Sequence, residues 1–183
     1  MSIYRETFIN QQTMILKNFL PLIILLMVFS GFAETRAQSD LTTFVLVRHA
    51  EKMENSDDPD LSEEGYDRAE RLTEMLSRIS FDAVYSSERV RTRETVRSIA
   101  DQHGVEILSY EPHEPEEEVK RLLNSNLGKT VLVSGHSNTT PFFANELLGR
   151  EHFEDKFDES DFGNLLIITI DGEGESKLLH LRY

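Results

Sequence analysis

The fold of this chain is decided by the stretch TFVLVRHAEK, Thr43 to Lys52. Its first five residues, TFVLV, are β-branched or large and apolar, and they predict a short buried strand. The run then ends abruptly in Arg48 and His49. A second stretch, VLVSGHSNTTP at 131–141, has the same form, because an apolar run again meets a histidine, His136. Two buried strands that each run into a histidine indicate a functional site at the strand ends.

Strand-like and helix-like patterns alternate along the rest of the chain without an internal repeat. Further strands are expected at 83–86, 105–110 and 129–134. Helices are expected behind the N-cap Ser62, at 91–102, at 114–123 and at 141–148, the first with Ala69, Leu72, Leu76 and Ile79 on its buried face. Two last runs, 165–170 and 177–183, flank the turn DGEGES and predict an antiparallel hairpin. This order predicts an α/β fold, a three-layer α/β/α sandwich whose mostly parallel mixed sheet carries helices on both faces.

The first 37 residues read as a secretory signal peptide. Lys17 precedes the apolar run 19–29, which is shorter than the roughly 18 residues expected of a membrane span. Small residues follow, and the cut is expected after Ala37. An uncleaved N-terminal anchor is the alternative interpretation. We therefore expect an exported protein, periplasmic or secreted, with no stable membrane span after processing.

The remaining residues, 38–183, are enough for one well-packed domain. Met14 opens a conventional signal start, and translation from it would make residues 1–13 a start-site artefact. The sequence leaves the oligomeric state open, and a monomer is compatible with it.

The composition excludes several kinds of partner and chemistry. A net charge of −14 repels nucleic acid and anionic membrane surfaces. The chain has no cysteine, which excludes disulfides, thiolate metal sites and a thiolate nucleophile. An anionic substrate must therefore be captured by a locally basic pocket.

Such a pocket is expected where the parallel strands end, because ligands of α/β sheets bind beyond the carboxyl ends of the strands. Arg48 and His49 follow the first strand, and Gly135-His136-Ser137 follows the fourth. The motif SSERVRTRET, 86–95, lies just beyond the second strand and sets Arg91 at the start of a helix, where backbone amides favour anions. Two histidines and two arginines on one sheet edge predict a phosphate pocket.

Three ordered motifs, RHAE, SSERVRTRET and GHSNT, resemble the histidine phosphatase superfamily in its phosphoglycerate-mutase-like branch, branch 1. The likeness runs from about Thr43 to Leu148, and alanine replaces the commoner glycine in the first motif. The resemblance implies a phosphoglycerate-mutase-like fold without cofactor or metal. It implies these roles: His49 as the nucleophile that is phosphorylated, Arg48 and Arg91 as ligands of the phosphoryl oxygens, His136 as the group that completes the pocket, Ser137 as a substrate-binding neighbour, and Glu111 as the proton donor to the leaving group.

The chemistry is consistent with this resemblance. An imidazole nitrogen is a competent nucleophile toward phosphorus, and the planar guanidinium of arginine matches two phosphoryl oxygens while staying charged. We therefore expect a cofactor-independent phosphatase that acts on a phosphorylated small molecule or phosphoprotein through a phosphohistidine intermediate.

Three other functions stay open. The first is a mutase that transfers the phosphoryl group to a second acceptor, and the second is a non-catalytic protein that binds a phosphorylated ligand. The third is a metal-dependent hydrolase built on His49, Glu51 and His136, although no metal-ligand spacing supports it. As a structural alternative, Arg91 would form a surface ion pair with Glu88 or Glu94. The acidic loop NSDDPD is expected to be solvated, and four histidines are expected to be incidental: His103, His113, His152 and His180.

Overall fold

The computed structural model describes residues 41–54 and 56–183. The predicted signal peptide, 1–37, lies outside these residues. Within the described part of the chain, no helix is long and apolar enough to cross a membrane.

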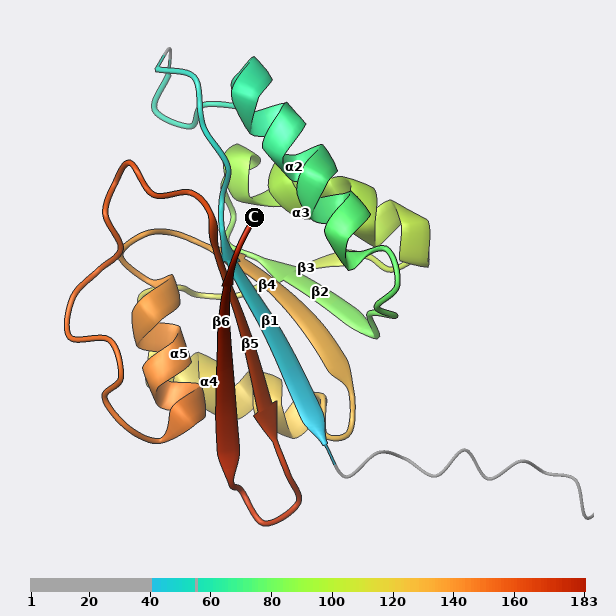
Figure 1. Ribbon diagram of the computed structural model, residues 1–183, viewed down its shortest axis with the longest axis vertical. Helices are drawn as coiled ribbons and strands as arrows, with labels where there is room; N and C mark the ends of the chain where they lie inside the picture. The colour runs from blue at the N-terminus through green and yellow to red at the C-terminus, as the bar shows by residue number, and fades with distance from the viewer. Residues whose placement is uncertain (1–40, 55) are drawn as a thin grey trace, which may run out of the picture. The chain divides into compact units, whose positions relative to one another are not determined.

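Six strands form one sheet in the order β3-β2-β4-β1-β5-β6 (Figure 1). The strands are β1 (Thr42–Arg48), β2 (Ala83–Ser86), β3 (Ile107–Ser109), β4 (Thr130–Gly135), β5 (Asn164–Ile170) and β6 (Ser176–Arg182). The helices are α2 (Glu63–Leu76), α3 (Val90–His103), α4 (Pro115–Ser125) and α5 (Thr140–Leu148). The first four strands pair in parallel, whereas β5 and β6 form an antiparallel hairpin at the edge of the sheet. The expected α/β fold with a mostly parallel mixed sheet is confirmed.

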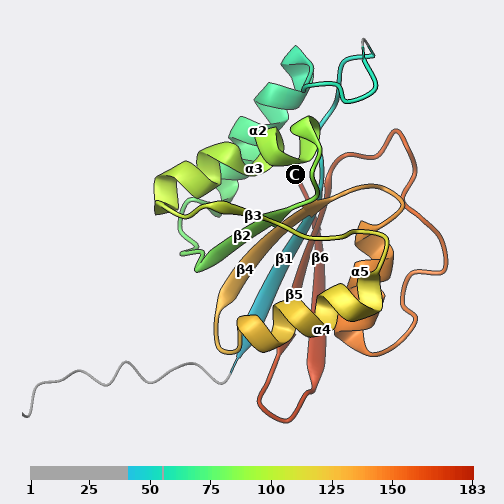
Figure 2. The same ribbon diagram turned by 180° about the vertical axis from the view of Figure 1, so that it is seen from behind.

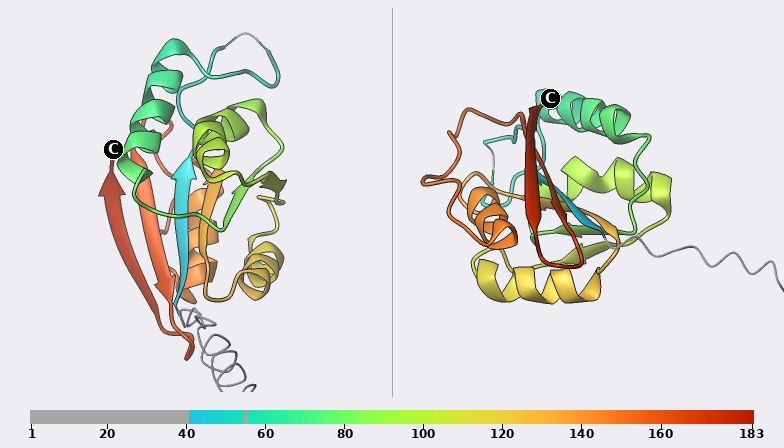
Figure 3. Two further views of the ribbon diagram at one scale, coloured as in Figure 1. Left: turned by 90° about the vertical axis from the view of Figure 1, so that its right-hand side faces the viewer. Right: turned by 60° about the horizontal axis from the view of Figure 1, so that its bottom comes forward.

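Alternating side chains of β1 build a core on each face of the sheet. Phe44 and Leu46 face α4 and α5, whereas Val45 and Val47 face α2 and α3. This alternation is the period of two that a strand imposes. Figure 2 turns the molecule round from the view of Figure 1 and shows the face of the sheet that α4 and α5 cover. Figure 3 shows the two helix pairs on opposite sides of the sheet. Burial on both faces explains why β1 reads as an uninterrupted apolar run.

Two local expectations were wrong. The first helix ends at Leu76, so Ile79 packs against the core from the turn after the helix instead of from its buried face. The third strand is limited to Ile107–Ser109, because it pairs with β2 over three residues only. The expected cap is present, since the Ser62 hydroxyl accepts a hydrogen bond from the Gly65 amide.

Candidate active site

The carboxyl ends of β1 and β4 meet at one edge of the sheet. Arg48 lies opposite Gly135 in the parallel register, and the His49 amide donates to the Gly135 carbonyl at 2.9 Å. The rings of His49 and His136 are consequently 5.4 Å apart, centroid to centroid, at an interplanar angle of 66°. Neighbouring strands thus bring together two histidines that lie far apart in the sequence.

The backbone is packed too closely here for larger residues. A Cβ at Gly135 would lie 2.6 Å from the Tyr110 hydroxyl. A Cβ at Gly65 would lie 2.0 Å from the carbonyl oxygen of Glu51, which means that α2 sits directly on the segment after His49. Gly65 therefore lets the backbone of α2 approach the segment after His49, and Gly135 leaves room for the Tyr110 hydroxyl.

Hydrogen bonding orients the imidazole of His49. Its Nδ1 lies 2.7 Å from the Ala50 carbonyl oxygen, which can only accept, so Nδ1 carries the proton and Nε2 keeps a free electron pair. Burial lowers the pKa of His49 from 6.5 to about 4, and the charges of Arg48 and Arg91 act in the same direction. The ring is therefore neutral at physiological pH and can act as a nucleophile through Nε2.

His136 is held by a residue that the sequence did not single out. Its Nε2 lies 2.9 Å from the hydroxyl of Ser87, which in turn is 3.0 Å from the Thr92 hydroxyl. Burial and the adjacent His49 lower the pKa of His136 to about 3. Ser87 and Thr92 both belong to the motif SSERVRTRET. The signal by which the sequence could have indicated their contact with His136 was this pair of hydroxyl residues next to an expected strand end.

Arg48 is almost completely buried, with 3% of its side chain exposed. Its Nη1 donates to the carbonyls of Asp158 and Asp161, at 2.9 and 3.0 Å, and its Nη2 donates to Glu159 at 3.1 Å. The ring of Phe162 lies 4.0 Å from the guanidinium carbon. The Arg48 Nε is buried without a hydrogen-bond partner among the described residues.

Arg91 has a similar arrangement at the start of α3. Its Nη1 lies 3.5 Å from Asp58, which also accepts from the Val90 amide at 3.2 Å, and its Nε is buried without a partner in the described chain. Burial lowers the pKa of Arg91, although an arginine remains charged in proteins. The structural alternative, a surface ion pair of Arg91 with Glu88 or Glu94, is not formed among the described residues, and the acidic loop is not simply solvated, because Asp58 reaches the site.

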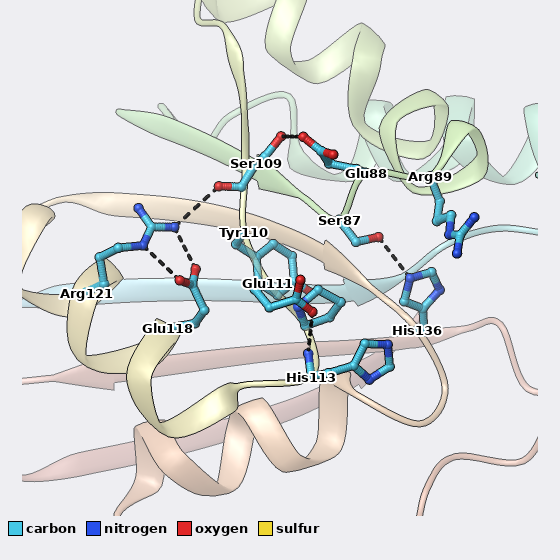
Figure 4. A pocket seen from close by; sticks show the side chains of 11 residues that line it. Ser87, Glu88, Arg89, Ser109, Tyr110, Glu111, His113, Glu118, Arg121 and His136 are labelled. Carbon is cyan, nitrogen blue, oxygen red and sulfur yellow. Dashed lines mark hydrogen bonds and ion pairs between the residues drawn. The ribbon is translucent and has the colours of Figure 1, made fainter.

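Glu111 lines a cavity of about 650 Å³ that also contains His136 (Figure 4). One carboxylate oxygen of Glu111 accepts from the His113 amide at 3.1 Å. His113, expected to be incidental, lines the same cavity. The structure thus places Glu111 beside the phosphoryl pocket, and its role as proton donor stays a prediction.

Ser137 and Glu51 make contacts away from the two histidines. The buried Ser137 hydroxyl donates to Glu159 at 3.0 Å, and its role in substrate binding stays a prediction. Both carboxylate oxygens of Glu51 are bound by Arg68 at 2.6 to 2.8 Å. Among the described residues, no group of three or more His, Cys, Asp and Glu side chains is placed to hold a metal. The metal-hydrolase alternative therefore lacks its carboxylate ligand.

The site combines a neutral imidazole with a free Nε2 and two arginines, each with a buried N–H that has no hydrogen-bond partner among residues 41–54 and 56–183. This arrangement defines a protein that can bind a tetrahedral oxyanion and form a bond to it through histidine. Comparison with known proteins agrees, because residues 44–112 match the model of the histidine phosphatase superfamily (branch 1). The matched segment, which contains Arg48, His49 and Arg91, is similar to this superfamily.

One curated relative is phosphoserine phosphatase 1 of Hydrogenobacter thermophilus, which is 39% identical over 75 residues. The match covers 37% of this chain and 36% of that enzyme, so the chain spans about a third of the length of this relative.

Solved structures share the fold at low identity. The phosphoserine phosphatase of Entamoeba histolytica, in complex with 3-phosphoglyceric acid, has a TM-score of 0.60 at 18% identity and covers 78% of this chain and 97% of its own. The protein histidine phosphatase SixA, in complex with tungstate, has a TM-score of 0.59 at 15% identity and covers 76% of this chain and 96% of its own. At these identities the likeness supports the phosphoglycerate-mutase-like fold alone.

Proposed function

We propose that the protein is an exported, cofactor-independent phosphatase that hydrolyses a phosphomonoester or a phosphohistidine through a phosphohistidine formed on His49. The observation that carries the proposal is the state of His49. Its Nδ1 is tied to a backbone carbonyl and its pKa is lowered to about 4, which leaves Nε2 unprotonated. A neutral ring beside two arginines is suited to attack phosphorus.

The reaction proceeds in two balanced steps. In the first, Nε2 of His49 forms a bond to phosphorus while the bond from phosphorus to the leaving-group oxygen breaks, and that oxygen takes a proton. In the second, water attacks phosphorus and gives up a proton to the group that lost one in the first step, the nitrogen–phosphorus bond breaks with its electron pair returning to Nε2, and phosphate leaves. Charge on the transferred group is stabilised by the positive charges of Arg48 and Arg91 and by N–H donors of these arginines and of His136, an electrostatic role that metal ions fill in other phosphoryl-transfer enzymes.

The proton of the first step is assigned to Glu111, on the cavity side of His136. An alkoxide is a poor leaving group and requires that proton. An imidazole leaves readily by itself, because its conjugate acid has a pKa of about 6.5. Relatives named as acting on phosphoserine and on protein histidine support both substrate classes.

Export is supported by the sequence only, through Lys17 and the apolar run 19–29. Both features lie outside the described residues.

The test is to trap the covalent intermediate. The protein is mixed with a radiolabelled phosphomonoester, quenched in base and in acid, and compared with His49→Ala. We expect acid-labile, base-stable label on the wild type and on the control His103→Ala, and none on His49→Ala, which should also lack turnover. Label that persists at wild-type levels in His49→Ala would refute the assignment of the nucleophile.

A further inference from the structure

The cavity beside His136 is lined by Arg89, an arginine outside the phosphoryl pocket described above. Eleven residues line this cavity: Ser87, Glu88, Arg89, Ser109, Tyr110, Glu111, Pro112, His113, Glu118, Arg121 and His136. Because His136 and its partner Ser87 belong to the phosphoryl pocket, the cavity is continuous with that pocket. The part of the substrate that leaves with its oxygen must therefore lie there, and the charges of the lining decide which leaving groups bind.

One of the two cations of the lining is already neutralised. Arg121 donates to both carboxylate oxygens of Glu118, at 3.0 and 2.6 Å. It also donates to the Ser109 carbonyl at 3.3 Å. This pair lies at the end of the cavity away from His136 (Figure 4). It contributes little net charge to a ligand at the phosphoryl pocket.

Arg89 is the second cation, and its guanidinium makes no hydrogen bond or ion pair with any residue that the structure describes. Figure 4 shows it beside His136, with His113 on the other side of that ring. Its charge lowers the pKa of both Arg91 and His136, which means that it acts on the phosphoryl pocket itself. Arg89 also occupies the N-cap of α3 without a capping hydrogen bond, a position where helices disfavour cations.

The carboxylates of the lining, unlike the guanidinium of Arg89, accept hydrogen bonds from described residues. Glu88 accepts from the Ser109 hydroxyl at 3.0 Å and points away from His136 in Figure 4, and Glu111 accepts from the His113 amide at 3.1 Å. Neutral donors do not cancel the charge of a carboxylate, so Glu88 and Glu111 oppose Arg89 in the cavity, whereas Arg89 is the cation of the lining that no described carboxylate pairs with.

We propose that Arg89 determines specificity by binding an anionic group on the leaving group, so that the preferred substrates are small phosphomonoesters with a second negative charge, such as a carboxylate. This proposal rests on the proposed function, because it places the leaving group in the cavity beside His136. The planar guanidinium suits a carboxylate or a second phosphoryl group, since it can donate two parallel hydrogen bonds to either.

Three esters of nearly equal size test the proposal: phosphoglycolate, ethyl phosphate and phosphoethanolamine, which carry an anionic, a neutral and a cationic leaving group. Values of kcat/KM are measured for the wild type, for Arg89→Gln and for Arg97→Gln. The last is a matched control, because Arg97 lies on the same helix and pairs with Glu94 outside the cavity. We expect the wild type to favour phosphoglycolate over ethyl phosphate by about tenfold, the worth of one charge-assisted hydrogen bond in an open site. The ratio should fall close to one in Arg89→Gln and persist in Arg97→Gln.

Two outcomes would overturn the proposal. A preference for phosphoethanolamine in the wild type would show that Glu88 and Glu111 dominate the cavity. A preference for phosphoglycolate that survives Arg89→Gln would place the anionic group elsewhere.

A binding measurement separates this proposal from the proposed function, because it does not depend on turnover. The affinities of the same three compounds are measured by calorimetry for His49→Ala and for the double variant His49→Ala, Arg89→Gln. Failure of the wild type to hydrolyse any of the three esters would count against the phosphatase. A lack of binding preference for phosphoglycolate, or one that does not depend on Arg89, would refute the specificity role alone.

Discussion

The neutral imidazole of His49 predicts that the protein loses stability as the pH falls below 7. Burial, aided by Arg48 and Arg91, lowers the pKa of His49 to about 4, whereas an unfolded chain binds that proton near pH 6.5. Between these two values the unfolded state holds more protons, and the free energy of unfolding therefore decreases as the pH decreases. The contribution of His49 is fully present above about pH 6.5 and is lost by about pH 4.

The size of the effect follows from the two pKa values. Each pKa unit corresponds to about 1.4 kcal/mol, which gives about 3 kcal/mol for the whole window and about 2 kcal/mol between pH 7 and pH 5. His136, whose pKa is about 3, adds a loss of the same sign, and the two rings influence each other. A loss of this order is a large share of the stability of an ordinary domain.

His49→Asn isolates the contribution of His49, because asparagine cannot be protonated and its amide can still donate to the Ala50 carbonyl. Urea denaturation at pH 7, 6 and 5 gives the free energy of unfolding of variant and wild type, and the difference between them removes the shared background of carboxylates. We expect His49→Asn to lose about 2 kcal/mol less than the wild type from pH 7 to pH 5. His103→Asn, which removes a histidine outside the site, controls for the substitution itself. Equal losses in His49→Asn and the wild type would mean that the fold does not keep Nε2 free of protons.

Three further predictions address the other parts of the proposal. Arg91→Lys keeps the charge and loses the planar fork, and we expect kcat to fall about 10²-fold while Arg97→Lys stays near the wild type; unchanged kinetics would place Arg91 outside the site. Glu111→Gln should slow hydrolysis of alkyl phosphates strongly and of activated aryl phosphates little, as steady-state kinetics on both classes would show; equal slowing of both would make Glu111 structural. When the full chain is expressed in a Gram-negative host, cell fractionation should find the product in the periplasm, and N-terminal sequencing should show that it begins after Ala37. A product that retains the run 19–29 would favour an anchor.

Most of the fold could be predicted from the sequence because its signals are local. The uninterrupted apolar run from Phe44 to Val47 marks a strand buried on both faces, and Ser62 and Gly149 mark where a helix begins and where another ends. Ile79 was misplaced because apolar spacing alone cannot tell the last turn of a helix from the turn that follows it.

The site was harder to predict where it depends on contacts between distant segments. Arg48 is bound by a loop 110 to 113 residues further along, and Arg91 by Asp58, 33 residues before it. Glu94, the partner of Arg91 in the structural alternative, instead pairs with Arg97, since residues three apart share a helix face. No local pattern shows such pairings, so the sequence could point to the two arginines but not to the groups that hold them.

These held arginines explain how a chain of net charge −14 can build an anion site. Glu159 and Asp58 bind the Nη atoms of Arg48 and Arg91, and they offset the cost of burying two guanidinium charges. In the described part of the chain, the Nε of each arginine is buried and has no hydrogen-bond partner, a costly state that an oxygen of a phosphoryl group can relieve. Because the guanidinium groups are already fixed, little reorganisation is needed when charge develops on the transferred group, and preorganised donors of this kind favour the transition state. The carboxylates beside the arginines therefore support anion binding by holding the donors in place, although their own charge opposes it.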